Sequence, residues 1–445
     1  MLSKTKITHL SYLIIILCSF PDRGVSQETF TLQSLVNRTL EEHYQIQIYQ
    51  NQESIAENNN TLGNAGFLPS VDLTGEYRRS IENSQSEFYT GDSRRGSNAL
   101  NTSLNAMVEV NWLIFDGFKM FARHDQLGYL QQLTTQDTRY FIEQTISDVS
   151  KAYYQLIKEK QILENYRKSL DVSRYRLQLE KQKRRIGSGN ALLHNQALVD
   201  YHTDSSLLIQ QKTLVQNLEV RINRIINREL EAGIPTPQEI LLFRSISTKD
   251  SLIDQALTHN KDLKAARLQE LLAETNTRLE AGDRYPEVRL FGNYNFRRQT
   301  SEAGFVESSR NYGPQYGVRV RFNLYNGNQE NIQVRNARIE EENASLNTRD
   351  IKLTIKASLI EHINLHQSGH HQLQLTRESL EAAEQSLQIA QQQLETGAIN
   401  GYDFRQTQLA LLQVKNSLIN LSFEIKALEV DILRLSGNLL EEVFN

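Results

Sequence analysis

Phe115-Asp116-Gly117 in the first half of the chain returns as Tyr325-Asn326-Gly327 in the second half, 210 residues later. The stretch Gly187-Ser188-Gly189-Asn190 returns at the same offset as Gly397-Ala398-Ile399-Asn400. A repeat of this length indicates a duplicated architecture, in which both halves fold alike. Leucines between the two motifs keep the same spacing, with Leu163, Leu170 and Leu177 matching Leu373, Leu380 and Leu387.

The repeat extends upstream at a slightly larger offset, because Val71, Leu73 and Tyr77 match Val288, Leu290 and Tyr294 at 217 residues. The difference of seven residues lies between Tyr77 and Phe115, so we expect a shorter connection in the second copy. The two structural repeats are predicted over residues 27–228 and 251–445. Residues 229–250 contain glycine and prolines without a counterpart and are predicted to be a connector.

The composition of the 445-residue chain favours extended helix over a large globular enzyme. Hydrophobic residues make up 39% of it, the mean hydropathy is −0.51, and there are only 6 prolines. The net charge of −4 comes from interspersed acids and bases, which excludes a basic nucleic-acid surface. No nucleophile–base constellation or phosphate loop stands out, so we expect neither an enzyme nor a cofactor.

Residues 1–26 predict an export signal. Lys4 and Lys6 precede an apolar run from Leu10 to Phe20, and small residues before Gln27 offer a cleavage site. The apolar run is too short to span a bilayer as a helix. Cys18, the only cysteine, is interpreted as part of this signal, with lipid attachment as the alternative.

Strict alternation of apolar and polar residues predicts strands over residues 70–81, 102–115, 286–298 and 315–325, with a polar loop from Asn83 to Asn101. The apolar face could meet lipid or the inside of a soluble sandwich. Arginines and glutamates on the other face favour a membrane barrel with a wet lumen. The predicted lipid-facing residues are Val71, Leu73, Tyr77, Val108, Val110, Trp112, Val288, Leu290, Tyr294, Val318, Val320 and Phe322.

Four strands cannot close a membrane barrel by themselves, because the smallest such barrels have eight. An open sheet edge cannot sit in lipid, where its backbone groups would find no hydrogen-bond partners. If the strands lie in a membrane, the chain must therefore share its barrel with further copies.

Very long helices follow each pair of strands. Residues 119–186 and 328–396 contain no proline, and each would reach roughly 100 Å as one helix at ~1.5 Å per residue. Leucines at 373, 380, 387 and 394 recur every seven residues, which predicts coiled-coil packing. Each copy is thus expected to form a helical hairpin, with tips near residues 187–190 and 397–401. A single opening helix is expected over Leu32 to Asn64.

This pattern resembles the TolC-like outer-membrane efflux protein family over the whole mature chain. The motifs that carry the resemblance are Gly66-Phe67-Leu68-Pro69, Leu113-Ile114-Phe115-Asp116-Gly117-Phe118, and the segments Asn195-Gln196-Ala197-Leu198 and Gln406-Thr407-Gln408-Leu409 after the tips. The resemblance implies a mainly α fold with membrane β structure. Three chains would form a homotrimer, in which a twelve-stranded outer-membrane β-barrel continues into a long periplasmic α-helical barrel.

The resemblance also implies a function, the passive exit duct of a tripartite efflux or type I secretion system. Such a duct would dock to a periplasmic membrane-fusion adaptor and to a proton-driven or ABC pump of the inner membrane. Small-molecule efflux and protein secretion both fit the sequence. The alternative from another class is a periplasmic coiled-coil scaffold without a channel.

The family narrows its periplasmic mouth with acidic residues just after the second hairpin tip, where this chain has Asp403 and Gln406. The resemblance implies a single ring of aspartates at this gate. The alternative role of Asp403 is an acid in the first turn of a helix, stabilised by the helix dipole. An adaptor would contact tip residues whose glycines alternatively serve only the turn, namely Arg185, Gly187, Ser188, Gly397, Ala398 and Ile399.

His362, His366 and His370 recur every four residues, a spacing that can hold a metal ion. They lie beside Gly369 on a helix expected to be largely solvated, so we interpret the row as a polar face and predict no metal site. Asp116, which precedes a glycine as Asn326 does, is interpreted as a turn residue between strand and helix.

Overall fold

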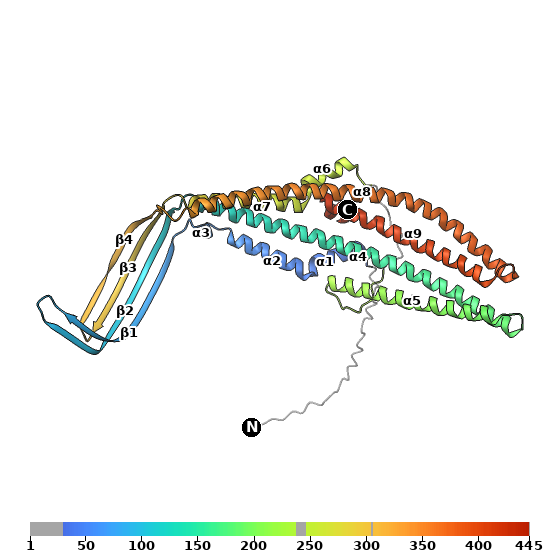
Figure 1. Ribbon diagram of the computed structural model, residues 1–445, viewed down its shortest axis with the longest axis horizontal. Coiled ribbons are helices and arrows are strands. Elements are labelled where there is room, and N and C mark those ends of the chain that lie inside the picture. Colours follow the sequence, from blue (N-terminus) through green and yellow to red (C-terminus); the bar gives the residue numbers. More distant parts are fainter. Residues whose placement is uncertain (1–29, 237–245, 304–305, 445) are drawn as a thin grey trace, which may run out of the picture.

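The computed structural model describes residues 30–236, 246–303 and 306–444, and it shows a long molecule with a β-sheet at one end and two hairpin tips at the other (Figure 1). The predicted signal over residues 1–26, with Cys18, lies outside the described residues, as does part of the connector predicted over 229–250. Among the helices of this described part, none has both the length and the apolar composition that a membrane crossing requires.

The described part of the chain opens with three helices instead of the single helix expected over Leu32 to Asn64. These are α1 (Leu32–Glu42), α2 (Tyr44–Asn59) and α3 (Leu62–Ala65). The backbone of His43 between α1 and α2 is extended, with ψ of 113°. The β-region conformation of this one residue interrupts the helix, and the apolar pattern on either side conceals the break.

The second copy breaks at the equivalent position, Asn260, between α6 (Lys249–His259) and α7 (Lys261–Gly282). The buried side chain of Asn260 accepts a hydrogen bond of 3.0 Å from the backbone N–H of Leu263. It also donates one of 3.0 Å to the carbonyl of Leu435. Asn260 therefore starts α7 and ties the bend to a neighbouring helix.

The longest helices are α4 (Lys119–Arg185) and α8 (Gln329–Thr396), with 67 and 68 residues. Each turns at its tip into a shorter antiparallel helix, α5 (Ala191–Ile225) or α9 (Gly401–Ser436). Both tips lie at the end of the molecule opposite the sheet (Figure 1), and α10 (Leu439–Phe444) follows α9. The matched lengths of α4 and α8 agree with the 210-residue repeat.

Four strands, β1 (Ser70–Glu87), β2 (Ser93–Phe115), β3 (Glu287–Ser301) and β4 (Ser308–Arg321), form one antiparallel sheet in the order β1-β2-β3-β4. Residues 83–101, expected to be a loop, mostly continue the β1–β2 hairpin. Polar side chains occupy both faces there, so the alternation on which the prediction depended is lost, although the backbone still pairs.

The last strand also differs from its predicted bounds of 315–325. It begins at Ser308, because the backbone of this stretch pairs with residues up to Thr300 of β3. It ends at Arg321, which pairs with Glu287, the first residue of β3. Phe322 therefore lies beyond the strand, where β3 offers no further partner.

Sharp corners join the strands to the long helices. Gly117 and Phe118 both have positive φ values, 72° and 68°, and a Cβ at Gly117 would lie 2.2 Å from the carbonyl oxygen of Gly282. The buried carboxylate of Asp116 accepts a hydrogen bond of 3.1 Å from the N–H of Met120 in the first turn of α4. This contact supports the interpretation of Asp116 as a turn residue.

The largest apolar core lies about halfway along the helices, where elements of both copies meet. Tyr153 of α4 is 1% exposed and its hydroxyl donates to the carbonyl of Phe30 at 3.1 Å. Around it pack residues of α1, α5 and α9, including Val36, Ile222 and Val430. A second cluster joins α6, α8 and α9 around Leu359 and Ile432. The two halves are thus fastened to each other near the middle of the molecule.

Candidate functional site

One face of the sheet is apolar across all four strands. The cross-strand register places Val71 opposite Val110 and Leu73 opposite Val108, and it continues from Val108 to Tyr294. Directly opposed residues point to the same side of a sheet. All the predicted lipid-facing residues within the strands share this face, and only Phe322 lies outside them. Leu73 is 78% exposed, so the described chain leaves this face uncovered.

The opposite face of the sheet is polar. Asp72 of β1 pairs with Glu109 of β2. Asn105, also of β2, lies between Glu76 of β1 and Arg297 of β3. The side chain of Asn105 contacts both neighbours, accepting from Arg297 at 3.1 Å and donating to Glu76 at 3.5 Å. One side of the sheet therefore suits water and the other suits an apolar environment.

Both hairpin tips have the same backbone turn. Gly187 and Gly397 adopt left-handed conformations with φ values of 79° and 77°. The N–H of Ser188 donates to the carbonyl of Lys183 at 3.0 Å, and the N–H of Ala398 donates to the carbonyl of Gln393 at 2.8 Å. This arrangement is the Schellman ending, for which glycine has no steric penalty. The equal turns place both tips at the same point of the repeat.

Most of the predicted adaptor-contact residues are exposed at these turns, including Arg185, Ser188 and Ala398. Ile399 is only partly exposed, because it packs against the small tip core around Phe404. Ile186, which was not among the predicted residues, is 74% exposed beside the first tip. An exposed isoleucine next to a helix end carries no sequence signal that would separate it from core isoleucines.

Asp403 lies in the first turn of α9, but the residue that caps this helix is Asn400. Its side chain accepts hydrogen bonds from the N–H groups of Tyr402 and Asp403 at 2.9 and 3.0 Å. The Asp403 side chain is exposed, as is that of Gln406 three residues later. Residues three apart lie on one side of a helix, so Asp403 and Gln406 share the exposed side of α9.

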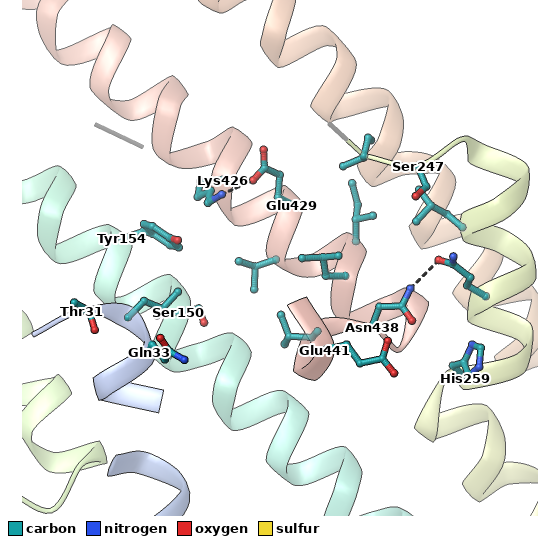
Figure 2. Close-up of a pocket in the computed structure, with 18 residues that line it drawn as sticks. Thr31, Gln33, Ser150, Tyr154, Ser247, His259, Lys426, Glu429, Asn438 and Glu441 are labelled. Carbon is teal, nitrogen blue, oxygen red and sulfur yellow. Dashed lines mark hydrogen bonds and ion pairs between the residues drawn. The ribbon is translucent and has the colours of Figure 1, made fainter. Parts of the chain in front are cut away.

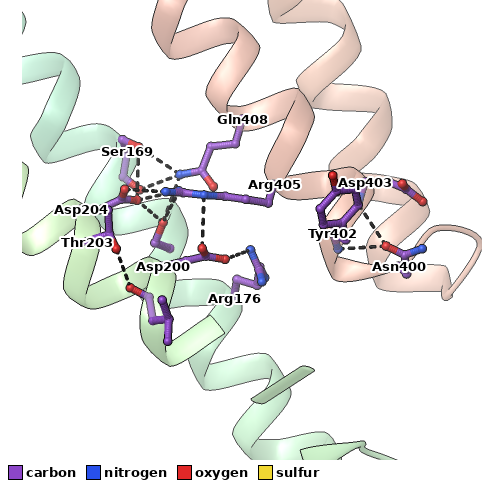
Figure 3. Close-up of polar contacts among 12 residues, drawn as sticks. Ser169, Arg176, Asp200, Thr203, Asp204, Asn400, Tyr402, Asp403, Arg405 and Gln408 are labelled. Carbon is purple, nitrogen blue, oxygen red and sulfur yellow. Dashed lines mark hydrogen bonds and ion pairs between the residues drawn. The ribbon is translucent and has the colours of Figure 1, made fainter. Parts of the chain in front are cut away.

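A buried polar cluster on the opposite side of α9 holds the two hairpins together (Figure 3). The guanidinium of Arg405 donates two hydrogen bonds of 2.7 Å to the carboxylate of Asp204 on α5. It also donates to the hydroxyl of Ser173 on α4 at 3.1 Å. Gln408 donates to the carbonyl of Ser169 on α4 at 2.9 Å. We call Ser169, Ser173, Asp204, Arg405 and Gln408 the hairpin clamp.

A second arginine extends the charge pattern beside the clamp. Arg176 of α4 is 2% exposed and pairs with Asp200 of α5 at 2.7 Å. Burial lowers the pKa of Arg405, but its hydrogen bond with Asp204 and the charges of Asp204 and Asp200 outweigh that effect and raise the pKa above the ordinary value. Arg405 is therefore charged at any physiological pH. Sequence reasoning missed the clamp because its residues are scattered over three helices.

The histidine row is only partly solvated, in contrast to the sequence-based expectation. His366 is 4% exposed, whereas His362 and His370 are half-buried. Gly369, which suggested a solvated face, lies against α9, where its missing side chain makes room for Ile425. The helix is therefore covered along this stretch.

The sequence of a relative and the folds of solved structures match this architecture. The outer membrane protein TolC of Vibrio cholerae is 24% identical over 279 residues, which span 60% of this chain and 58% of the relative. The Campylobacter jejuni CmeC outer membrane channel shares the fold with a TM-score of 0.79 at 12% identity, covering 98% of this chain and 94% of that one. The outer membrane protein VceC of Vibrio cholerae gives 0.74 at 16%, covering 91% and 96%.

Long helical hairpins joined to a sheet with one apolar face are thus the fold that this chain shares with outer membrane proteins such as VceC and CmeC. The chain belongs to the outer membrane efflux protein family, whose model matches residues 35–228 and 252–438. The resemblance drawn from the duplicated motifs is confirmed, as are the fold and the location that it implied.

Proposed function

We propose that this chain forms, with two further copies, the outer-membrane exit duct of a tripartite export system. The observation that carries the proposal is the continuous apolar face of a four-stranded sheet whose outer strands, β1 and β4, have open edges within the described chain. Open edges are excluded from lipid, so the edge strands must pair with those of other copies. Three chains then supply twelve strands, which is enough for a closed membrane barrel.

The polar face of the sheet would line the lumen of this barrel. A tilted membrane strand needs ~9–11 residues. The apolar stretch from Val71 to Tyr77 reaches this length when one or two flanking residues of β1 at each end are included. Beyond it, the β1–β2 hairpin carries charges such as Glu82 and Arg95, which suit the water outside. The sheet therefore divides into a membrane part and an aqueous extension.

The helices supply the periplasmic part of the duct. At ~1.5 Å per residue, α4 and α8 each extend about 100 Å away from the sheet. Their tips would dock to a periplasmic membrane-fusion adaptor, through exposed residues such as Arg185, Ser188 and Ala398. An inner-membrane pump, proton-driven or ABC, would supply the energy, and both small-molecule efflux and type I secretion fit such a duct.

The gate would lie at the second tip. Because Arg405 is anchored to its own chain, Asp403, two residues away and about 200° around the helix, points to the other side (Figure 3). In a closed ring of three chains this side would face the lumen or the neighbouring copy. The three Asp403 carboxylates would then form one anionic ring, with the uncharged Gln406 beside it.

Crosslinking in membranes tests the shared barrel. Apart from Cys18 the chain has no cysteine, so cysteines introduced in pairs on β1 and β4 report only the contact between these edges. Scanning several pairs finds the register, and we expect a disulfide-linked species of three copies. A control pair of cysteines on α2 and α6 should not crosslink the copies in this way. Exclusively monomeric protein across the scan would reject the proposal.

A further inference from the structure

Three side chains of types that can bind metal ions meet between α8 and α9, near the middle of α8 and close to the C-terminal end of α9. His366 and His370 lie one turn apart on α8, and Glu429 reaches them from α9. The candidate ligand atoms all lie within 4.8 Å of one another. His366 and Glu429 are 4% and 3% exposed, so their polar atoms lie inside the protein.

The distances fit a tetrahedral ion. The Nε2 atoms of His366 and His370 are 3.3 Å apart. Two nitrogens that each bind a zinc ion at ~2.0–2.1 Å in a tetrahedral arrangement are separated by about 3.3 Å. The Oε1 atom of Glu429 lies 3.6 Å from Nε2 of His366, close to the same value. The third pair, Glu429 and His370, belongs to the same group of atoms within 4.8 Å, so their ligand atoms would have to move closer to share one ion.

The packing of the helices creates this proximity. A Cβ at Gly369, between the two histidines, would lie 2.8 Å from Cγ1 of Ile425. The glycine therefore allows α9 to approach α8 more closely than another residue would. Glu429, one turn beyond Ile425, is carried to the histidine pair by this approach.

The surroundings also suit a bound ion. Lys426 donates to Oε2 of Glu429 at 2.6 Å, which leaves Oε1 directed at His366. Glu429 and Lys426 also line a cavity of about 720 Å³ (Figure 2), although the two histidines are not part of its lining.

We propose that His366, His370 and Glu429 bind one divalent ion of the zinc type per chain, with water completing the coordination. Two imidazoles and one carboxylate form a ligand set that zinc commonly accepts. The ion would join α8 to α9 and stiffen the hairpin that carries Asp403. The positive charge of Lys426 opposes a dication, so we expect weaker binding than at a four-ligand structural zinc site.

Zinc titration of the full chain tests the proposal. The detergent-solubilised protein, carrying an affinity tag without histidine, is treated with chelator and titrated with zinc against a chromophoric competitor. We expect one zinc ion per chain, and visible absorption bands of a tetrahedral site when cobalt replaces zinc. Removing a ligand with His366→Ala or His370→Ala should weaken zinc binding at least about 10-fold.

His371→Ala is the matched control, because this exposed histidine is adjacent to His370 on the same helix. Size-exclusion chromatography shows whether each variant still assembles. Because His370 is only half-buried, His370→Ala should disturb the packing less than His366→Ala does. Wild-type protein that binds no zinc would overturn the proposal. Binding that His366→Ala, His370→Ala and His371→Ala weaken equally would assign the zinc to surface histidines and overturn it as well.

Discussion

The guanidinium of Arg405 forms two hydrogen bonds of 2.7 Å with the carboxylate of Asp204, although the two residues belong to different copies of the repeat. The positions that correspond to them by the 210-residue offset are Asn195 and Val414. An asparagine and a valine cannot form the same ion pair, so the clamp has no second, symmetry-related counterpart. The matched hairpin lengths follow from the duplication, whereas the polar contact that joins the hairpins is not part of the repeat.

Replacing Arg405 with methionine should strongly destabilise the protein. The substitution leaves the carboxylate of Asp204, which is 2% exposed, buried without its cation, at a cost of about 3–5 kcal/mol. Denaturant unfolding followed by circular dichroism measures the loss. Adding Asp204→Asn should recover part of it, because the buried charge is then removed.

The matched control is Arg167→Met, which breaks an exposed pair with Glu164 at 3.5 Å. Exposed pairs contribute about 0–1 kcal/mol, so this variant should unfold almost as the wild type does. Equal effects of the Arg405 and Arg167 substitutions would show that the clamp does not hold the hairpins together.

A second prediction concerns the gate. Asp403→Asn should change the single-channel conductance in planar bilayers and reduce block by divalent cations, because it removes the only charge of the expected ring. Gln406→Asp should have the opposite effect, since it adds a second ring on the same side of α9. Glu378→Gln removes an exposed carboxylate of α8 and should leave both properties unchanged. If Asp403→Asn changes neither the conductance nor the block by divalent cations, Asp403 is not part of the gate.

The two faces of the sheet can be distinguished by placing the same residue at neighbouring positions. Val108→Arg puts a charge on the apolar face, at a cost of about 2–4 kcal/mol if that face lies at the middle of the bilayer. Glu109→Arg puts it on the polar face, where the lumen would accept it. We expect much less assembled protein in outer-membrane fractions for Val108→Arg only. If Glu109→Arg lowers the amount of assembled protein and Val108→Arg does not, the polar face and not the apolar face would have to meet lipid, which would contradict the proposal.

The sequence predicted the long-range plan of the fold better than its local details. Equal spacing of Gly187 and Gly397 from the strand exits predicted two matched hairpins, because helix length follows directly from residue number. The breaks at His43 and Asn260 escaped prediction, because each depends on one residue's backbone and on contacts with distant helices.

The candidate sites show the same division. Alternation along single strands was enough to predict one shared apolar face, because the side chains of a strand alternate by geometry. The clamp and the buried state of His366 were missed. Both depend on which helices pack together, and the burial of His366 depends in particular on the close approach of α9 at Gly369.

Stability should fall with decreasing pH through His43. The pKa of His43 is lowered first by burial and then by the charge of Arg224, so the folded protein resists protonation more than the unfolded chain does. As the pH falls below the ordinary value of 6.5, the unfolded state takes up protons first and gains relative stability. His43→Asn introduces the residue that the second copy has at the equivalent position, Asn260. Below pH 6.5 the stability of this variant should depend less on pH than that of the wild type. Thermal unfolding over a pH series measures the slope, and an unchanged slope would assign it to other groups.

Asn260 should contribute more to the free energy of unfolding than an ordinary helix-capping residue does. Its side chain both caps α7 and bonds to the carbonyl of Leu435, and it is only 6% exposed. Asn260→Ala removes both contacts and leaves a buried carbonyl short of a donor, so we expect a loss of about 2–3 kcal/mol in the free energy of unfolding. Thr248 precedes α6 without a side-chain cap, which makes Thr248→Ala a suitable control with little expected change. If the two variants unfold at the same denaturant concentration, the bend is fixed by apolar packing around Leu263 and not by the asparagine.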